Sequence, residues 1–208
     1  HPNALQLRGQ TLIRMDRLDE AEVDINKALA RLPGDCMVLN AAAALASARR
    51  DWPAAAEFYR RSVEAQPHDV VARVKYAEML MTLDRFDDAR GQLEAIRRIA
   101  PGDLDVRIAF AQMLQRKAPK EGPPSPEEAR AAVADLAKVV AESGSPYQRA
   151  RALVTRAAIE LQFTGDLKQA RLDAEAAMRE HAGSQLDDLC RTIIENCRIL
   201  EKKPGSEY

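Results

Sequence analysis

Prolines recur at a fixed interval through the first half of the chain. Pro33, Pro67 and Pro101 are thirty-four positions apart, and a short polar turn follows each of them. Proline fits the first turn of a helix but interrupts its interior, so each one separates the end of one helix from the start of the next. A period of about 20 to 50 residues is typical of a repeat array. The sequence therefore predicts a stack of similar helical units.

Small side chains recur with the same period. One set consists of Ala21, Ala55 and Ala89. A second set consists of Gly9, Ala43, Ala77 and Ala111. Small residues where two helices cross allow a short distance between the helix axes, and larger side chains then fill the space between units. Because one helix pair cannot bury its apolar face alone, neighbouring pairs must stack.

This pattern resembles the tetratricopeptide repeat family. Members of that family have a small residue in the middle of the first helix (helix A), an alanine early in the second (helix B), and a closing proline. The first unit has Gly9, Ala21 and Pro33 at these positions. In later units, Arg73 and Arg107 stand where the family usually has a bulky apolar residue. The resemblance implies an all-α, right-handed α-solenoid of about five helix pairs with a C-terminal capping helix.

The predicted domain is a single array covering residues 1–201. Its repeats are expected at about 2–35, 36–69, 70–103, 104–144 and 145–183, followed by a capping helix at about 185–201 and a disordered tail at 202–208. The apolar face predicted for the capping helix consists of Leu186, Leu189, Ile193, Ile194, Cys197 and Leu200.

The fourth repeat departs from the period. Three prolines and a glycine at positions 122–126 oppose helix, so we expect helix A to end near Arg116 and a loop insertion near 117–126. Ser125 is a good capping residue, and Pro126 followed by two glutamates suits the start of helix B.

Charge and cysteine content restrict the partners and the compartment. The 31 basic and 32 acidic residues are interspersed, which argues against nucleic acid or an anionic membrane as the partner. No apolar run is long enough to span a bilayer, so direct membrane insertion is not expected. Cys36, Cys190 and Cys197 are predicted to be buried free thiols, which favours a cytoplasmic location. The periplasm is the alternative if a signal or anchor preceded His1, and the Ala/Arg-rich usage suggests a bacterial source.

Catalytic and cofactor motifs are not found in the sequence. There is no nucleophile elbow, phosphate-binding loop or dinucleotide-binding glycine fingerprint, and His1, His68 and His181 lack metal-ligand spacing. Acid pairs such as Asp87-Asp88 fall at predicted helix starts, where they stabilise the helix dipole. The sequence therefore predicts a protein that is not an enzyme and has no metal or cofactor.

The family resemblance implies that the A helices line a concave groove that holds a peptide or protein segment. The implied groove residues are Gln6, Gln10, Arg14, Asn40, Ser47, Lys75, Glu78, Met81, Gln112 and Gln115, with Thr155, Ile159 and Gln162 from the fifth repeat. Side-chain amides both donate and accept hydrogen bonds, so they can satisfy the main chain of an extended peptide. The competing interpretation is that they form ordinary solvated helix faces.

The predicted function is a non-catalytic scaffold for protein–protein interaction. Some family members hold a partner's C-terminal carboxylate with a cluster of basic residues and asparagine, but only Lys75 is basic at the matching positions, so this subtype is rejected. The alternative is the repeat region of a larger bacterial protein, such as a glycosyl- or sulfotransferase, or an envelope component for polysaccharide export or cytochrome assembly. Self-association through the apolar face of the first repeat (Leu5, Leu12 and Ile13) is a third hypothesis.

Overall fold

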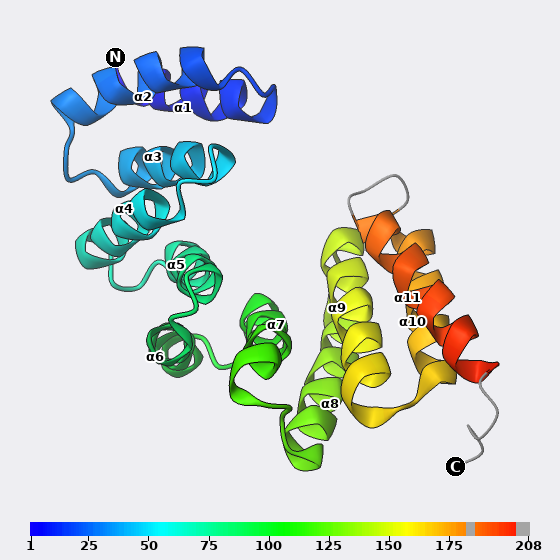
Figure 1. Ribbon diagram of the computed structural model, residues 1–208. Coiled ribbons are helices and arrows are strands. Elements are labelled where there is room, and N and C mark those ends of the chain that lie inside the picture. The colour runs from blue at the N-terminus through cyan, green and yellow to red at the C-terminus, as the bar shows by residue number, and fades with distance from the viewer. Residues whose placement is uncertain (182–185, 203–208) are drawn as a thin grey trace. The chain divides into compact units, whose positions relative to one another are not determined.

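The computed structural model describes residues 1–181 and 186–202. These residues form α-helices and one π-helical turn, with no strand among them (Figure 1). The elements are α1 (Pro2–Arg14), α2 (Leu18–Arg31), α3 (Cys36–Ala48), α4 (Trp52–Ala65), α5 (Val70–Thr82), α6 (Phe86–Ile99), α7 (Leu104–Glu121), α8 (Pro126–Glu142), α9 (Pro146–Ile159), η1 (Glu160–Thr164), α10 (Leu167–Glu180) and α11 (Leu186–Glu201). The predicted all-α helical repeat fold is confirmed. Among the helices described, none has the length and apolar character needed to cross a bilayer.

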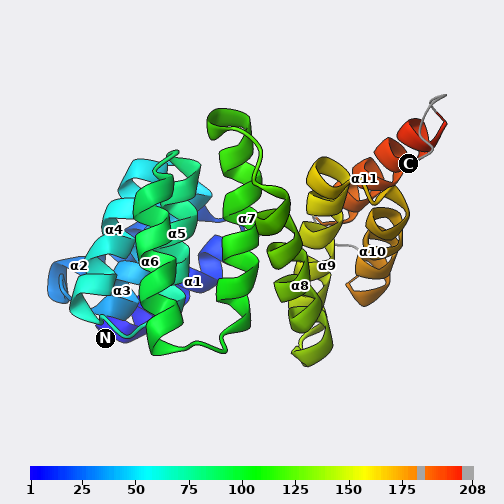
Figure 2. The same ribbon diagram turned by 90° about the horizontal axis from the view of Figure 1, so that it is seen from below.

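The helices group into two compact units, residues 1–101 and the residues from Gly102 onward. In the first unit, the hairpins α1–α2, α3–α4 and α5–α6 follow one another in chain order (Figure 1). In the second unit, α7–α8 and α9–α10 form hairpins, and α11 packs on α9 and α10 (Figure 2). Each hairpin thus buries its apolar side against the next within its unit, as stacked repeats require.

Small residues lie where the two helices of a hairpin cross. Ala43 and Ala77 on the A helices are fully buried, as is Ala21 on a B helix. At Gly9, an added Cβ would lie 2.7 Å from Cγ1 of Ile25 on α2. This distance is shorter than carbon atoms tolerate, so the close approach of α1 and α2 requires the missing side chain.

Aspartate side chains cap three of the A helices. Asp35, Asp69 and Asp103 follow the repeat period, and each carboxylate accepts hydrogen bonds from backbone N–H groups two or three residues ahead. Such a cap satisfies donors that the first helical turn leaves free. We attributed these turns to the preceding prolines and did not predict the caps, although the polar turn after each proline contains them.

A left-handed residue connects helix A to helix B in the repeats with short turns. Asp16, Arg50 and Asp84 have φ angles of 58°, 60° and 61°, and Gly165 has a φ of 76° in the fifth repeat. The first three again follow the repeat period. Only glycine adopts this conformation without steric cost, so the other three positions carry modest backbone strain.

The predicted boundary of helix A in the fourth repeat is wrong. We expected it to end near Arg116, but α7 continues to Glu121 and includes Pro119. Because Pro119 lies in the last turn, it interrupts the backbone ladder only where the helix is about to end. Gly122, with a φ of 95°, terminates it and leaves residues 122–125 as the loop. The capping role predicted for Ser125 is confirmed, since its hydroxyl accepts a hydrogen bond from the backbone N–H of Glu128.

The face of α11 that packs on α9 and α10 differs from the prediction in part. Its buried residues are Cys190, Ile193 and Cys197, and Leu186 and Ile194 are partly buried beside them, whereas Leu189 is 46% exposed. Cys190, Ile193 and Cys197 are separated by three and four residues and so share one helical face, and Leu189 lies at its edge. Residue 185 and the tail from 203 to 208 lie outside the described residues.

Candidate functional site

Two side-chain amides occupy the same repeat position on neighbouring A helices of the first unit. Gln6 on α1 and Asn40 on α3 are one repeat apart, and α1 packs against α3. Gln6 is only 3% exposed, and Asn40 is half-buried. Nε2 of Gln6 and Oδ1 of Asn40 are both buried and have no hydrogen-bond partner. The structure therefore leaves one donor and one acceptor unsatisfied at this position.

Unsatisfied polar atoms of this kind are expensive. A buried donor or acceptor without a partner costs about 1–3 kcal/mol, so natural proteins contain few of them. Both atoms are enclosed in this conformation, so a partner molecule would recover part of that cost only if these side chains turned outward to meet it. The amides of Gln6 and Asn40 are thus the strongest indication of a binding site on the A helices.

The other predicted residues of the first unit lie on α1, α3 and α5. Gln10 is half-buried and Arg14 is exposed, both on α1. On α5, Nζ of Lys75 lies 2.7 Å from Oε2 of Glu78, and the two form an ion pair. These two charges neutralise each other, so the pair adds little net charge to the face.

Ser47 and Met81 contribute less to the exposed surface. The hydroxyl of Ser47 donates to the backbone oxygen of Ala43 at 2.8 Å. Met81 is 2% exposed, so its side chain belongs to the core of the first unit in this conformation.

In the second unit, the predicted residues lie on α7 and α9. Gln112 and Gln115 are half-buried, and Nε2 of Gln115 donates to the backbone oxygen of Thr155 at 3.5 Å. Thr155 and Ile159 are buried, with 5% and 0% exposure, so placing them on an open groove was wrong. The reason is an extra residue in the fifth repeat, which shifts its helix A by one position.

The extra residue is visible as the π-helical turn η1. Gly9 and Ala21 are twelve residues apart in the first repeat, whereas Ala157 and Ala170, both fully buried, are thirteen apart in the fifth. A π-turn is wider than an α-turn and absorbs one additional residue. With this correction, Arg8 corresponds to Arg156.

The same ion pair occurs in both repeats. Arg8 donates two hydrogen bonds to Asp24, and Arg156 donates two to Asp173. Both aspartates are buried, but the side chain of Arg8 is 67% exposed and that of Arg156 only 15%. The hydrogen bonds from Arg8 lower the pKa of Asp24 below its usual value. This recurrence was not predicted from the sequence, because the two pairs fall at equivalent repeat positions only after the inserted residue is allowed for.

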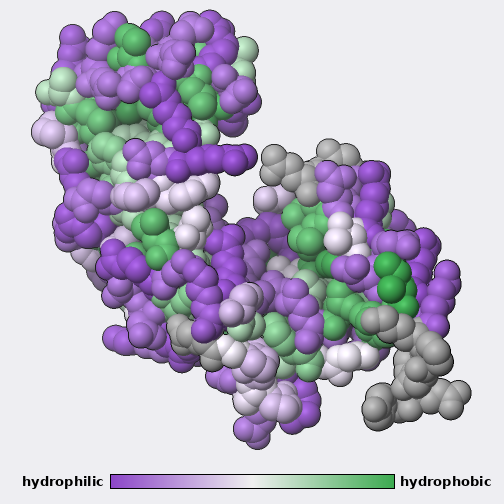
Figure 3. Space-filling model, in the orientation of Figure 1, coloured by the Kyte–Doolittle hydropathy of each residue, from purple (hydrophilic) through white to green (hydrophobic). Residues whose placement is uncertain are grey.

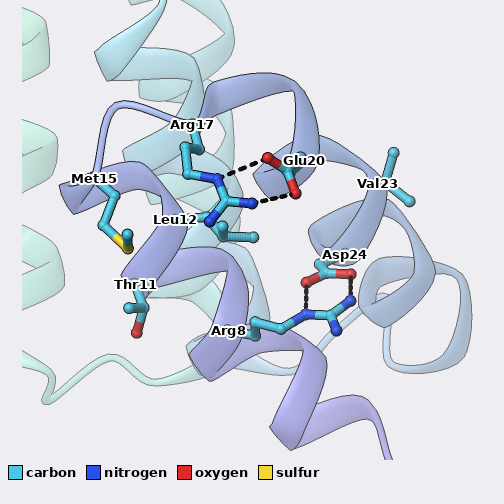
Figure 4. A pocket seen from close by; sticks show the side chains of 8 residues that line it. All are labelled: Arg8, Thr11, Leu12, Met15, Arg17, Glu20, Val23 and Asp24. Atoms are coloured by element: carbon cyan, nitrogen blue, oxygen red, sulfur yellow. Dashed lines mark hydrogen bonds and ion pairs between the residues drawn. The ribbon is translucent and has the colours of Figure 1, made fainter.

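The first of these pairs lines a recess of about 470 Å³ on α1 and α2 (Figure 4). The lining residues are Arg8, Thr11, Leu12, Met15, Arg17, Glu20, Val23 and Asp24. Figure 4 shows a second paired arginine, Arg17, whose Nε and Nη2 lie 2.7 Å from the carboxylate oxygens of Glu20. The wall is thus mixed, with two neutralised ion pairs and several apolar side chains.

The apolar residues exposed on the first repeat differ from those predicted. Leu12 is buried and Leu5 is half-buried, whereas Leu7, Met15 and Val23 are 58%, 58% and 52% exposed. Leu12 packs on Ala21 in the hairpin core, and this contact explains its burial. The side of both units seen in Figure 3 is largely hydrophilic, with smaller hydrophobic areas between the helices.

Comparison with known proteins identifies the repeat. A family model described as tetratricopeptide repeat matches residues 46–114. This segment of the chain consists of tetratricopeptide repeats. Among solved structures, a thermophilic tetratricopeptide repeat protein of Thermus thermophilus is similar with a TM-score of 0.74 and 18% identity, over 96% of this chain and 100% of that one. Yeast Tom70 is similar with a TM-score of 0.71 and 19% identity, over 99% of this chain and 42% of that one. These likenesses show the fold.

A curated relative matches part of the chain. Anaphase-promoting complex subunit 3 of Schizosaccharomyces pombe is 24% identical over 116 residues, which are 56% of this chain and 17% of the relative. The chain therefore spans less than a fifth of that protein's length. Tetratricopeptide repeats are generally non-catalytic and present extended surfaces for protein interaction.

Proposed function

We propose that this chain is a non-catalytic protein-interaction scaffold whose first unit binds an extended peptide segment along the A helices. The observation that supports this proposal is the pair of unsatisfied amide atoms, Nε2 of Gln6 and Oδ1 of Asn40. One is a donor and the other an acceptor, which matches the C=O and N–H groups that each peptide unit offers.

The chemistry of the face indicates what kind of segment it would prefer. Neutral amides recognise main-chain groups irrespective of the side chains attached to them. The charges of Lys75 and Glu78 on α5 are already paired at 2.7 Å, so a strongly charged partner gains little there. We therefore propose an uncharged, extended segment as the preferred ligand of the first unit.

A selection experiment tests this function. A phage library of random twelve-residue peptides would be selected on the immobilised full chain, and the affinity of the enriched peptides measured by isothermal titration calorimetry. We expect saturable binding that weakens about tenfold when Asn40→Leu removes one hydrogen bond, since tenfold corresponds to about 1.4 kcal/mol.

Asn26→Leu is the matched control, because Asn26 is an exposed amide on the B helix α2, away from the A helices. This variant should bind the peptides as the unmodified chain does. Failure to enrich any saturable binder would contradict the peptide site. Peptides whose affinity changes with neither Gln6→Leu nor Asn40→Leu would contradict it too.

We also propose self-association as an accessory mode, supported by the exposure of Leu7, Met15 and Val23 on the first repeat. Sedimentation velocity over a hundredfold concentration range tests it, and a concentration-independent monomer would dismiss it.

A further proposal is that this chain acts as the interaction region of a longer bacterial protein. It rests on the chain covering 42% of yeast Tom70 and 17% of the fission-yeast relative, and the complete reading frame would test it.

A further inference from the structure

The fifth repeat buries two carboxyl groups beside a single guanidinium. Glu160 and Asp173 are 4% and 3% exposed, and Arg156 lies between their helices. Both oxygens of Asp173 accept hydrogen bonds from Arg156, and Nε2 of Gln169 donates a further one at 2.8 Å. Oε1 of Glu160 is 3.8 Å from Nε of Arg156, too far for a strong hydrogen bond. The positive charge of Arg156 is therefore paired with the carboxylate of Asp173 and not with that of Glu160.

The remaining carboxyl group cannot easily carry a charge of its own. Oε2 of Glu160 is buried and accepts no hydrogen bond. An isolated buried carboxylate is so costly that the group takes up a proton instead. A protonated Oε2 can donate to the carboxylate of Asp173, which explains why it has no donor of its own. Burial, and secondly the charge of Asp173, raise the pKa of Glu160 to about 8.

Every element packed around Glu160 contributes a titratable or charged group. These are Arg156 on α9, Asp166 in the turn after η1, Asp173 on α10, the thiol of Cys197 on α11, and Arg130 on α8, which lines one surface recess together with Glu160. Arg156 is the basic group among those that act directly on the pKa of Glu160, and the two aspartates raise that pKa. The surroundings as a whole therefore favour the neutral form.

The position of Glu160 couples the protonation of its side chain to the backbone conformation of η1. Glu160 begins η1, and its carbonyl oxygen accepts hydrogen bonds from the backbone N–H of Gly165 at 2.8 Å and from the hydroxyl of Thr164 at 3.1 Å. In the first repeat, Leu12 stands at the equivalent position beside the Arg8–Asp24 pair. That repeat has the ion pair without a second buried carboxyl group and without a π-turn, because Glu20 beside the pair is exposed, so it is a control within the same chain.

We propose that Glu160 is a proton-dependent latch, which holds η1 closed between α9 and α10 when neutral and leaves the buried site when ionised. Opening exposes the carboxyl group to water, where its pKa returns to about 4.5. A group whose pKa is raised in the closed state favours opening as pH rises. The opening equilibrium should therefore increase up to about tenfold per pH unit between about 4.5 and 8, then level off.

Hydrogen exchange on the full chain tests the latch. Amide protection would be measured at pH 6 and pH 8 and corrected for the intrinsic pH dependence of exchange. We expect protection of the Gly165 and Leu167 amides to fall up to about a hundredfold over these two units. Glu160→Gln, which stays neutral, should give equal protection at both pH values, and the equivalent turn at Asp16 and Arg17 should also be insensitive.

Protection at Gly165 and Leu167 that does not change between pH 6 and 8, or a Glu160→Gln variant that keeps the full dependence, would overturn the latch. If Glu160→Gln does not fold, ¹³C NMR titration of the Glu160 carboxyl in the unmodified chain decides the matter. An apparent pKa below about 7 overturns the proposal, and a higher value supports it.

Discussion

Arg156 donates two hydrogen bonds to the carboxylate of Asp173, one from Nε and one from Nη2 at 2.6 Å, and so joins α9 to α10. Removing the arginine would leave Asp173 buried at 3% exposure without its cation. Breaking one side of a buried pair costs about 3–5 kcal/mol. We therefore expect Arg156→Met to destabilise the second unit by about 3 kcal/mol, measured by native-state hydrogen exchange in urea.

Arg8→Met is the matched variant in the first unit. The side chain of Arg8 is 67% exposed, so water can reach the site once the guanidinium is gone. We expect a clearly smaller loss of stability than for Arg156→Met. Equal losses in the two units would show that the surrounding burial does not control the strength of the pair.

The unsatisfied amide of Gln6 predicts a conflict between stability and binding. Replacing a buried, unpartnered polar group by an apolar group of similar shape removes its desolvation penalty. Gln6→Leu should stabilise the first unit by about 1 kcal/mol in urea denaturation. The same substitution should lower the affinity of the peptides selected on the full chain. A Gln6→Leu variant that loses stability would indicate that Nε2 has a partner in solution, such as an ordered water.

The left-handed turn after η1 predicts a specific effect at Gly165. Its φ is 76°, and no atom lies within 4 Å of an added Cβ, so any cost of a side chain comes from the backbone alone. Gly165→Ala should destabilise the second unit by about 1 kcal/mol. Gly144→Ala is the control in the same unit, since that position is equally open and has no positive φ. It should be neutral or slightly stabilising, and a loss equal to that of Gly165→Ala would refute the backbone argument.

Close packing at Gly9 predicts non-additive mutations. A Cβ there would lie 2.7 Å from Cγ1 of Ile25, which is 1% exposed and cannot move freely. Gly9→Ala should therefore destabilise the first unit by about 1 kcal/mol, because overpacking outweighs the better helix propensity of alanine. Ile25→Ala should cost less in the Gly9→Ala background than alone, since it also removes the clash. A double-mutant cycle in urea measures the difference, and full additivity would contradict the contact.

The buried thiols predict low reactivity. Burial raises the pKa of Cys190 to about 11 and also raises those of Cys36 and Cys197. Because the thiolate is the reactive form, few thiolates are present at pH 8. We expect a colorimetric disulfide reagent to label the native chain slowly and all three cysteines at once in denaturant. Complete labelling of the native chain within the mixing time would show that these helices open far more readily than their packing suggests.

The sequence by itself determined the repeat. Residues such as Ala21, Ala43 and Pro33 recur with a period of one hairpin, and local packing at each crossing demands a small side chain whatever the rest of the chain does. Helix starts such as Ser125 were also predictable, since capping depends on residues only a few positions apart. The candidate groove residues on the A helices came from the family resemblance applied to this register, and they stay predictions.

Tertiary structure alone decided which of those residues carry an unsatisfied group and which are buried. Met81 and Thr155 are covered by neighbouring helices, and Gln6 is enclosed without a partner for Nε2. The pairing of Arg156 with Asp173 beside Glu160 depends on a π-turn that shifts one helix by a residue. These features arise from contacts between helices, where a one-residue shift changes which side chains meet, and a periodic pattern read along one chain does not contain that information.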